Sequence, residues 1–232
     1  MILAENLTVH YAHSTAAALC GVSFSIAAGE RAALIGANGA GKSTLLLALA
    51  GELPPSSGFA SIDGITVEKK NLGEIRRKTG VVFQNPDDQL FMPTVYEDIA
   101  FGLRNYGMAE EQIKERIEKV LESLAISHIA MRMTAKLSGG EKRLAALAGV
   151  LVMQPQALLF DEPSSYLDPR ARRRLINILR GLEQTLVIAT HDLELARHTC
   201  ERVILLAEGR VAADGKTTDV LSNEELLRKC GL

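Results

Sequence analysis

A nine-residue stretch near the start of the chain has the residue types and spacing of a loop that binds phosphate groups. It reads Gly36-Ala37-Asn38-Gly39-Ala40-Gly41-Lys42-Ser43-Thr44 and fits the pattern G-x-x-x-x-G-K-[ST] in full. Glycines allow successive backbone N–H groups to turn toward one anion, and a helix that starts here adds partial positive charge. We expect Lys42 to reach the terminal phosphates and Ser43 to ligate Mg²⁺. A dinucleotide-binding G-x-G-x-x-G reading fails, because Thr44 occupies the position of the third glycine.

Two acidic residues follow a short apolar run at residues 157–160, which predicts a buried strand ending in carboxylates. The first, Asp161, can face the Mg²⁺ held by Ser43, directly or through a water molecule. The second, Glu162, is placed to polarise an attacking water as a general base. Taken alone, the pair also fits an exposed acidic turn, but the phosphate loop upstream favours the catalytic interpretation.

A serine-glycine loop, Leu137-Ser138-Gly139-Gly140-Glu141, precedes a second helical run. Ser138 can cap that helix, while Gly139 and Gly140 leave backbone N–H groups uncovered. A Ser-Gly-Gly turn is common by itself. Its place shortly before the acidic strand indicates a second anion site at a helix N-terminus.

The elements that must position these residues alternate between strand and helix at both ends of the chain. The pattern predicts strands at residues 2–9, 22–26, 32–35, 58–62, 81–83, 157–160 and 185–189, and helices at 44–50, 110–124, 141–153 and 169–182. We expect an α/β fold: a P-loop NTPase core with a mostly parallel sheet, an antiparallel N-terminal β-subdomain and an inserted helical subdomain. The expected domain is single, residues 1–232, with the helical subdomain at about 85–154.

Composition excludes several classes of protein. The 26 Lys and Arg residues nearly balance the 28 Asp and Glu residues, which argues against a dedicated nucleic-acid binder. Four Arg residues at 170, 172, 173 and 174 are better explained as a solvated helix face, because no aromatic residues alternate with them. Three distant cysteines without a C-x-x-C pair indicate neither a disulfide framework nor a zinc site. The longest apolar run, residues 144–153, is too short to span a bilayer, so we expect no membrane crossing.

Together these motifs resemble those of the ATP-binding cassette (ABC) ATPases, in the same order along the chain. The matching segments are the phosphate loop 36–44, the serine-glycine loop 137–141, the acidic strand 157–162, the stretch 164–168 and His191. The resemblance implies ATP and Mg²⁺ as cofactors, Tyr11 stacked on adenine and Gln84 at the metal and the γ-phosphate. It also implies Glu162 as the catalytic base and His191 at the γ-phosphate. Simpler readings remain for two of these residues: packing for Tyr11, and part of a helix cap for His191.

The resemblance also implies a partner cassette. In this family the nucleotide lies between two subunits, with the serine-glycine loop of one closing over the phosphate loop of the other. A second ABC ATPase subunit, either an identical copy or a paralogue, is therefore expected, and Asp168 is expected in a loop at the dimer interface.

Aromatic residues are scarce, yet five of the ten lie close together, at Phe83, Phe91, Tyr96, Phe101 and Tyr106. Together with Met92 they form the kind of apolar cluster that receives a partner, although a local core is the simpler alternative. The resemblance places this segment where transporter ATPases contact their membrane subunits. We therefore predict a docking groove at residues 85–103, with Phe91, Met92, Tyr96 and Phe101 as its contacts.

The amino-acid sequence of residues 83–91, 94–102 and 138–151 is most similar to the corresponding sequence in the ATPases of energy-coupling factor importers, especially those of the cobalt and nickel type. That likeness implies a transmembrane coupling subunit, a substrate-specific membrane subunit and a peripheral place on the cytoplasmic face of the membrane. An importer of a vitamin or another small solute is the alternative. A soluble ABC ATPase of DNA repair or the ribosome is disfavoured, because the chain has neither a long coiled coil nor a second cassette. A GTPase is disfavoured by the absence of N-K-x-D.

Overall fold

In the central sheet, one strand separates the acidic strand from the strand that leads into the phosphate loop. The structure, a computed structural model, describes residues 1–12 and 16–232. The strands of the central sheet are β3 (Arg31–Ile35), β6 (Thr79–Val82), β7 (Ala157–Asp161), β8 (Thr185–Thr190), β9 (Arg202–Ala207) and β10 (Arg210–Lys216). Within the described residues their order is β10-β9-β3-β8-β7-β6, and all neighbours are parallel except the β9–β10 pair. The interior strands are buried on both faces, as their continuous apolar runs predict.

A second, antiparallel sheet covers one side of this core. Its strands are β1 (Ile2–His10), β2 (Ala17–Ile26), β4 (Ser57–Ile62) and β5 (Ile65–Thr66), in the order β2-β1-β4-β5. Buried and exposed residues alternate along much of β2, which is the pattern of a sheet with one face in the core. The helix that follows the phosphate loop, α1 (Lys42–Leu49), packs against strands of both sheets. The expected antiparallel N-terminal β-subdomain is confirmed.

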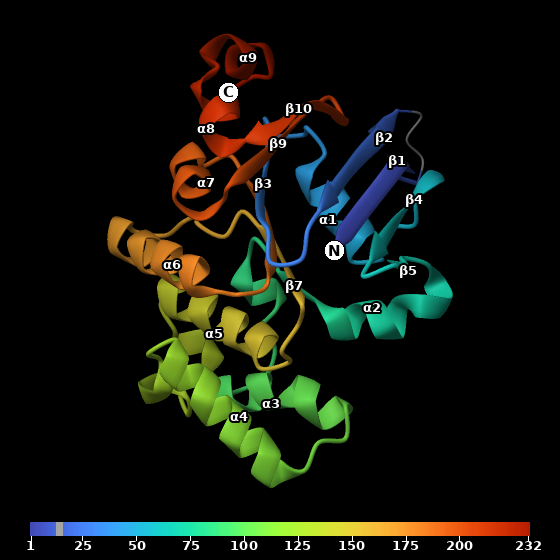
Figure 1. Cartoon of the computed structure of the whole chain (residues 1–232). Helices are drawn as coiled ribbons and strands as arrows, with labels where there is room; N and C mark the ends of the chain where they lie inside the picture. The colour runs from blue at the N-terminus through green and yellow to red at the C-terminus, as the bar shows by residue number, and fades with distance from the viewer. Residues whose placement is uncertain (13–15) are drawn as a thin grey trace.

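Helices cover the other side and extend beyond the sheet. These helices are α3 (Val95–Asn105), α4 (Glu110–Ser123), α5 (Gly139–Leu151), α6 (Pro169–Gly181), α7 (Leu193–Thr199), α8 (Thr217–Ser222) and α9 (Glu224–Lys229), whereas α2 (Leu72–Lys78) packs on the side of the antiparallel sheet. Figure 1 shows α3, α4 and α5 gathered below the central sheet, away from the N-terminal strands. In the described part of the chain, no helix combines the length and the apolar character needed to cross a bilayer.

Helix α5 starts earlier than the sequence pattern predicts, at Gly139 instead of Glu141. The cause is a capping box. The Ser138 hydroxyl accepts a hydrogen bond from the N–H of Glu141, and the Glu141 carboxylate accepts one from the N–H of Ser138. The same device, made by Thr94 and Glu97, starts helix α3, which the pattern analysis did not identify as a separate element.

The predicted strand at residues 81–83 is shifted, since β6 covers Thr79–Val82 and leaves Phe83 outside. The N–H of Phe83 bonds the side chain of Gln89, and its carbonyl accepts a hydrogen bond from Arg143. These partners replace strand pairing at that position. The chain therefore leaves the sheet one residue before Gln84.

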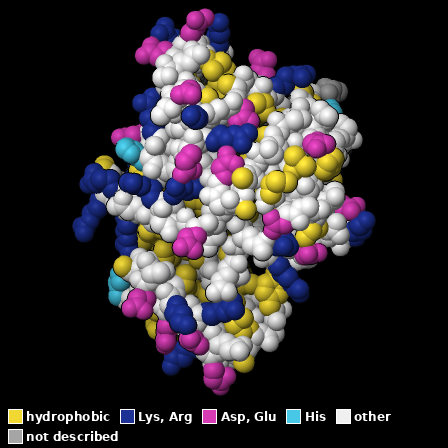
Figure 2. Space-filling view, in the orientation of Figure 1, with side chains coloured by type: hydrophobic (Ala, Val, Ile, Leu, Met, Phe, Trp, Pro, Cys, Tyr) yellow, Lys and Arg dark blue, Asp and Glu magenta, His cyan; other side chains and the backbone are white. Residues whose placement is uncertain are grey.

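Basic side chains gather over α6, as Figure 2 shows. Two of the four arginines near its start make specific contacts within the chain. Arg172 pairs with Asp192 and Glu194, and Arg174 donates to the carbonyls of Leu124 and Ala125. Half of the cluster is thus engaged in holding α6 to its neighbours.

Candidate functional site

The phosphate loop connects β3 to α1 and lies tightly against other parts of the chain. Gly41 adopts a φ of +105°, which glycine alone adopts easily, and it precedes the first helical residue. At Gly36 a Cβ atom would stand 2.5 Å from the carbonyl oxygen of Leu206 in β9. Both glycines are therefore needed for the path of the loop, whatever it binds.

Lys42, the first residue of α1, is buried at 7% exposure even though its side chain is charged. Its Nζ donates to the carbonyl oxygens of Gly36 (2.7 Å) and Ala37 (3.2 Å) and lies 3.8 Å from Oε1 of Glu162. The ammonium group is thereby held over the loop, where a phosphate group can replace carbonyl oxygens as its partner.

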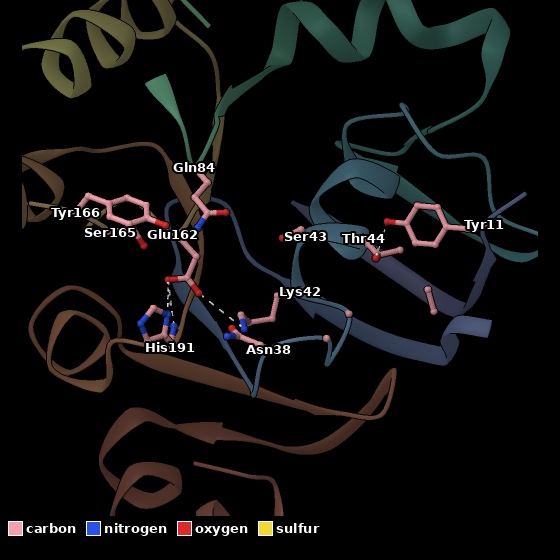
Figure 3. Close-up of a pocket in the computed structure, with 13 residues that line it drawn as sticks. Tyr11, Asn38, Lys42, Ser43, Thr44, Gln84, Glu162, Ser165, Tyr166 and His191 are labelled. Carbon is pink, nitrogen blue, oxygen red and sulfur yellow. Dashed lines mark hydrogen bonds and ion pairs between the residues drawn. The ribbon is translucent and has the colours of Figure 1, made fainter. Parts of the chain in front are cut away.

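Glu162 follows the end of β7 and is also buried, at 6% exposure. Its backbone has a φ of +45°, a left-handed conformation that is uncommon for a residue with a side chain. Oε2 accepts hydrogen bonds from Oγ1 of Thr190 (3.2 Å) and the N–H of His191 (3.3 Å), and lies 2.9 Å from Nδ1 of His191. Figure 3 shows this carboxylate between His191 and Lys42. Backbone geometry and hydrogen bonds together fix one orientation of the Glu162 side chain.

Asp161, the last residue of β7, carries an oxygen suited to a cation. Its Oδ1 is buried and accepts no hydrogen bond within the described residues. Burial raises the pKa of Asp161, and a hydrogen bond from Ser43 opposes that rise. A buried carboxylate oxygen without a donor, next to the hydroxyl of Ser43, fits the hard oxygen ligands that Mg²⁺ prefers.

Lys42, Ser43 and Glu162 line one cavity of about 620 Å³, whereas Asp161 lies behind Ser43 and is not part of its wall. Its walls include Tyr11, Asn38, Gly39, Gly41, Lys42, Ser43, Thr44, Gln84, Glu162, Ser165, Tyr166 and His191. Tyr11 and Tyr166 lie on opposite sides of it, and Oη of Tyr11 is 3.0 Å from Oγ1 of Thr44 (Figure 3). Most of the predicted nucleotide-contacting residues are thus brought together. Gly36, Ala37 and Ala40 shape the loop without lining the cavity.

The serine-glycine loop lines a different cavity, of about 530 Å³. Ser138, Gly139 and Gly140 meet Asp168 there, and Asp168 caps α6 by accepting from the N–H groups of Arg170 and Ala171. The phosphate loop and the serine-glycine loop of one chain therefore belong to separate cavities. Tyr166, 95% exposed, borders both.

Sequence reasoning missed Asp192, which anchors the loop after Glu162. Its carboxylate accepts from Arg172 at 2.7 Å, from Ser164 at 3.1 Å and from the N–H of Leu195 at 2.9 Å, where it caps α7. Partial burial works to raise the pKa of Asp192, but the hydrogen bonds from Arg172, Leu195 and Ser164 outweigh it and lower the pKa to about 2. In the sequence, Asp192 is recognisable only as an acidic residue after His191. That pattern predicts a helix cap but does not predict the contacts with Arg172 and Ser164.

The predicted docking residues lie away from both cavities. Phe91 and Phe101 are 63% and 40% exposed, and their rings stand edge to face with centroids 4.9 Å apart. The N–H groups of Phe91 and Met92 both donate to Oδ1 of Asp98 at 2.9 Å. Tyr96 is different: it is half-buried and packs against the core. The exposed pair fits a docking surface, whereas Tyr96 fits the local-core alternative as well.

Comparison with known families and proteins gives consistent matches. The family model described as "ABC transporter" matches residues 19–165. The Geobacter sulfurreducens protein GSU1281, provisionally named an ABC transporter ATP-binding protein, is 49% identical over 93% of this chain and 86% of its own length. The energy-coupling factor transporter ATP-binding protein EcfA of Methanothermobacter thermautotrophicus is 44% identical over 100% of this chain and 76% of its own. The cobalt import ATP-binding protein CbiO of Syntrophus aciditrophicus is 41% identical over 100% of this chain and 84% of its own.

Two solved structures have the same architecture. CbiO1 from Clostridium perfringens, described as part of the ABC transporter complex cbiONQ, superposes with a TM-score of 0.88 at 38% identity, over 98% of this chain and 93% of its own. The ATP-binding cassette MJ0796, described as a dimer in a post-hydrolysis state bound to ADP and Pi, gives 0.84 at 30% identity, over 94% and 99%. The expected α/β class, with its mostly parallel sheet and helical insertion, is confirmed by these neighbours.

Proposed function

We propose that this chain, which belongs to the ABC transporter family and is an ATP-hydrolysing subunit of an importer, serves an importer of the energy-coupling factor type. The proposed cargo of that importer is cobalt or nickel. The observation that carries the choice of importer is the 41% identity, over the whole chain, to a cobalt import ATP-binding protein. The relative EcfA, whose name specifies no solute, supports the importer type without the metal. A vitamin or another small solute is the alternative cargo.

In the proposed mechanism the phosphates of ATP lie along residues 36–44, with Lys42 on the terminal phosphates and Tyr11 against the adenine. The exposed ring of Tyr11 and its position at the far side of the cavity from His191 support that orientation. Ser43, Asp161 and Gln84 are assigned to Mg²⁺, which would neutralise charge on the phosphates. The unpartnered Oδ1 of Asp161 is the feature that supports this metal site.

Glu162 is assigned as the general base and His191 as a contact of the γ-phosphate. Support comes from the buried, fully oriented carboxylate of Glu162, which faces the cavity between Lys42 and His191. A general base must be held within hydrogen-bond reach of the water that it activates, and a fixed side chain meets that need.

A second cassette completes each site in this proposal. The separation of the phosphate loop from Ser138, Gly139 and Gly140 supports it, because no single chain brings both loops to one nucleotide. The relative MJ0796 is described as a dimer. The partner is a second copy or a paralogue, and Asp168 lies in the proposed interface.

We further assign residues 85–103 to the docking of a transmembrane coupling subunit, with a substrate-specific membrane subunit in the same complex. The exposed rings of Phe91 and Phe101 support this surface. The chain would then work as a peripheral subunit on the cytoplasmic face of the membrane, as a single domain with residues 85–154 as its helical subdomain.

The test is reconstitution with the membrane proteins that co-purify with this chain. We expect ATP hydrolysis to be stimulated by those proteins, and vesicles carrying the complex to accumulate radioactive cobalt or nickel in an ATP-dependent way. Uptake of a vitamin instead would overturn the metal assignment and keep the importer type. Full ATPase activity with no membrane protein recovered, in any detergent tested, would overturn both.

A further inference from the structure

Arg143 is a buried cation whose hydrogen bonds all go to backbone carbonyl oxygens. It lies in α5, at 3% exposure. Nη1 donates to the carbonyl of Phe83 and Nη2 to the carbonyl of Gln84, both at 2.6 Å, while Nε is buried without a partner among the described residues. Burial lowers the pKa of Arg143. Two carbonyl oxygens thus provide the polar contacts of a guanidinium that is almost entirely removed from water.

Burying a cation without a carboxylate is costly, since the desolvation of the charge is only partly offset by neutral acceptors. A methionine or leucine at this position of α5 would avoid that cost. What the arginine adds is geometric: its planar, forked group binds two successive carbonyls in one orientation. The backbone of Phe83 and Gln84 is therefore fixed relative to α5.

Other bonds attach the neighbouring residues to the same helix. Nζ of Lys142 pairs with Asp87 at 2.6 Å, and Nε2 of Gln89 donates to the carbonyl of Ala146 at 2.8 Å. Unlike these, the bonds of Arg143 are made directly to Gln84, the residue whose side chain lines the phosphate-loop cavity. Arg143 itself lines the serine-glycine cavity. Arg143 thus connects the wall of the serine-glycine cavity to the backbone of a residue that lines the phosphate-loop cavity.

We propose that Arg143 is a positioning residue for ATP hydrolysis: it holds Gln84 to helix α5, so that a shift of this helix at the serine-glycine cavity moves Gln84 at the nucleotide. Helix α5 begins at Gly139, in the serine-glycine loop, and includes Arg143, so it carries such a shift as one rigid element. The inference rests on the proposed role of Gln84 at Mg²⁺ and the γ-phosphate, and extends it to a residue outside that site.

The test compares Arg143→Met with Lys142→Met in the purified chain. Arg143→Met should lower kcat by about tenfold or more, because misplacement of an active-site group by an ångström can cost about a hundredfold. The KM for ATP should change by less than about twofold, and the Mg²⁺ concentration for half-maximal activity should rise. Lys142→Met removes an attachment of the same segment and should leave kcat within about twofold. Arg143→Lys, which can still bond one carbonyl, should be intermediate.

Gln84→Ala, alone and combined with Arg143→Met, separates this inference from the role assigned to Gln84. If Arg143 acts through Gln84, adding Arg143→Met to Gln84→Ala changes kcat by less than about twofold. Multiplicative losses in the double variant would overturn the inference and leave Gln84 in its role. Wild-type kcat in Gln84→Ala would overturn that role and, with it, the inference. Equal losses of kcat in Arg143→Met and Lys142→Met would show general loosening of the segment and would also overturn the inference.

Discussion

The phosphate-loop cavity and the aromatic segment at residues 85–103 are built in opposite ways. In the cavity, Lys42 and Glu162 are buried, and their charged groups are bonded by the protein itself. In the aromatic segment the side chains of Phe91 and Phe101 project into solvent, and Asp98 fixes only the backbone behind Phe91. Chemistry requires oriented groups before the substrate arrives, whereas a docking surface requires apolar area that a partner can cover. Each prediction below tests one side of this contrast.

The largest effect is expected at Glu162. Glu162→Gln keeps the shape of the side chain and removes its basicity, so kcat should fall by about 10²- to 10⁴-fold while ATP still binds. Steady-state ATPase assays measure the fall, and gel filtration with ATP should reveal a trapped dimer. The exposed Glu183, changed to Gln, serves as the control and should hydrolyse ATP normally. Steady turnover by Glu162→Gln would rule out the general-base assignment.

The next effect concerns the aromatic segment. Phe91→Asp places a charge in the exposed aromatic pair and should weaken binding to the membrane partner by at least about 2 kcal/mol, because central aromatic anchors dominate interfaces. Met92→Asp should act in the same direction. Co-purification from detergent measures the loss, and a fluorescent ATP analogue should bind the variants as before. Phe59→Asp, at an exposed aromatic residue of β4 outside this cluster, is the matched control. Unchanged recovery of the complex with Phe91→Asp would contradict the assignment of residues 85–103 as the docking surface.

A smaller effect is expected from Asp192→Asn, which weakens the anchor of the loop after Glu162. Hydrogen bonds hold the folded pKa of Asp192 at about 2, below the value of about 3.9 in an unfolded chain, so its contribution is present above about pH 4 and fades as the pH falls toward 2. Because the Asp192 and Arg172 side chains remain 18% and 23% exposed, we expect a loss of only about 1 kcal/mol at neutral pH.

Urea unfolding of both proteins across this pH range checks that expectation. The difference between wild type and Asp192→Asn should shrink on acidification below about pH 4. Asp87→Asn, at a side chain that is 60% exposed in its pair with Lys142, should shift the free energy of unfolding by less than about 0.5 kcal/mol. A difference that stays constant from neutral to acid pH would contradict the role of the charged form.

The smallest effect is expected at Tyr166, which combines a φ of +63° with 95% exposure. Tyr166→Gly removes about 1–2 kcal/mol of left-handed strain and costs about 0.5–1 kcal/mol of backbone entropy. The free energy of unfolding of the isolated chain should therefore rise by up to about 1.5 kcal/mol, measured by thermal unfolding. Tyr166→Ala loses the ring but keeps Cβ, so it should gain nothing. An equal rise in the free energy of unfolding in both variants would show that the exposed ring, and not the left-handed backbone, destabilises the wild-type chain.

Sequence alone predicted the local structure where a motif is made of neighbours in the chain. The phosphate loop, the capping serine at 138 and the adjacent acids 161 and 162 are local patterns, and the structure places each as their spacing predicts. Arg143 and Asp192 could not be found this way, since their partners lie 59 and 20 residues away in the chain. A buried arginine in an apolar helix and an acid after His191 acquire meaning only from tertiary contacts. The assigned roles of Tyr11, Gln84 and His191 stay predictions that rest on resemblance and on their place in the cavity.

The position of β3 in the central sheet has a consequence for synthesis on the ribosome. Both of its partners, β8 and β9, come from the last quarter of the chain. Until residues 185–207 have been made, the strand before the phosphate loop has two open edges, and edges of this kind invite pairing with other chains. The strand that leads into the phosphate loop is therefore paired on both edges only after residues 185–207 have been made. Before that point its open edges are expected to need protection from pairing with other chains.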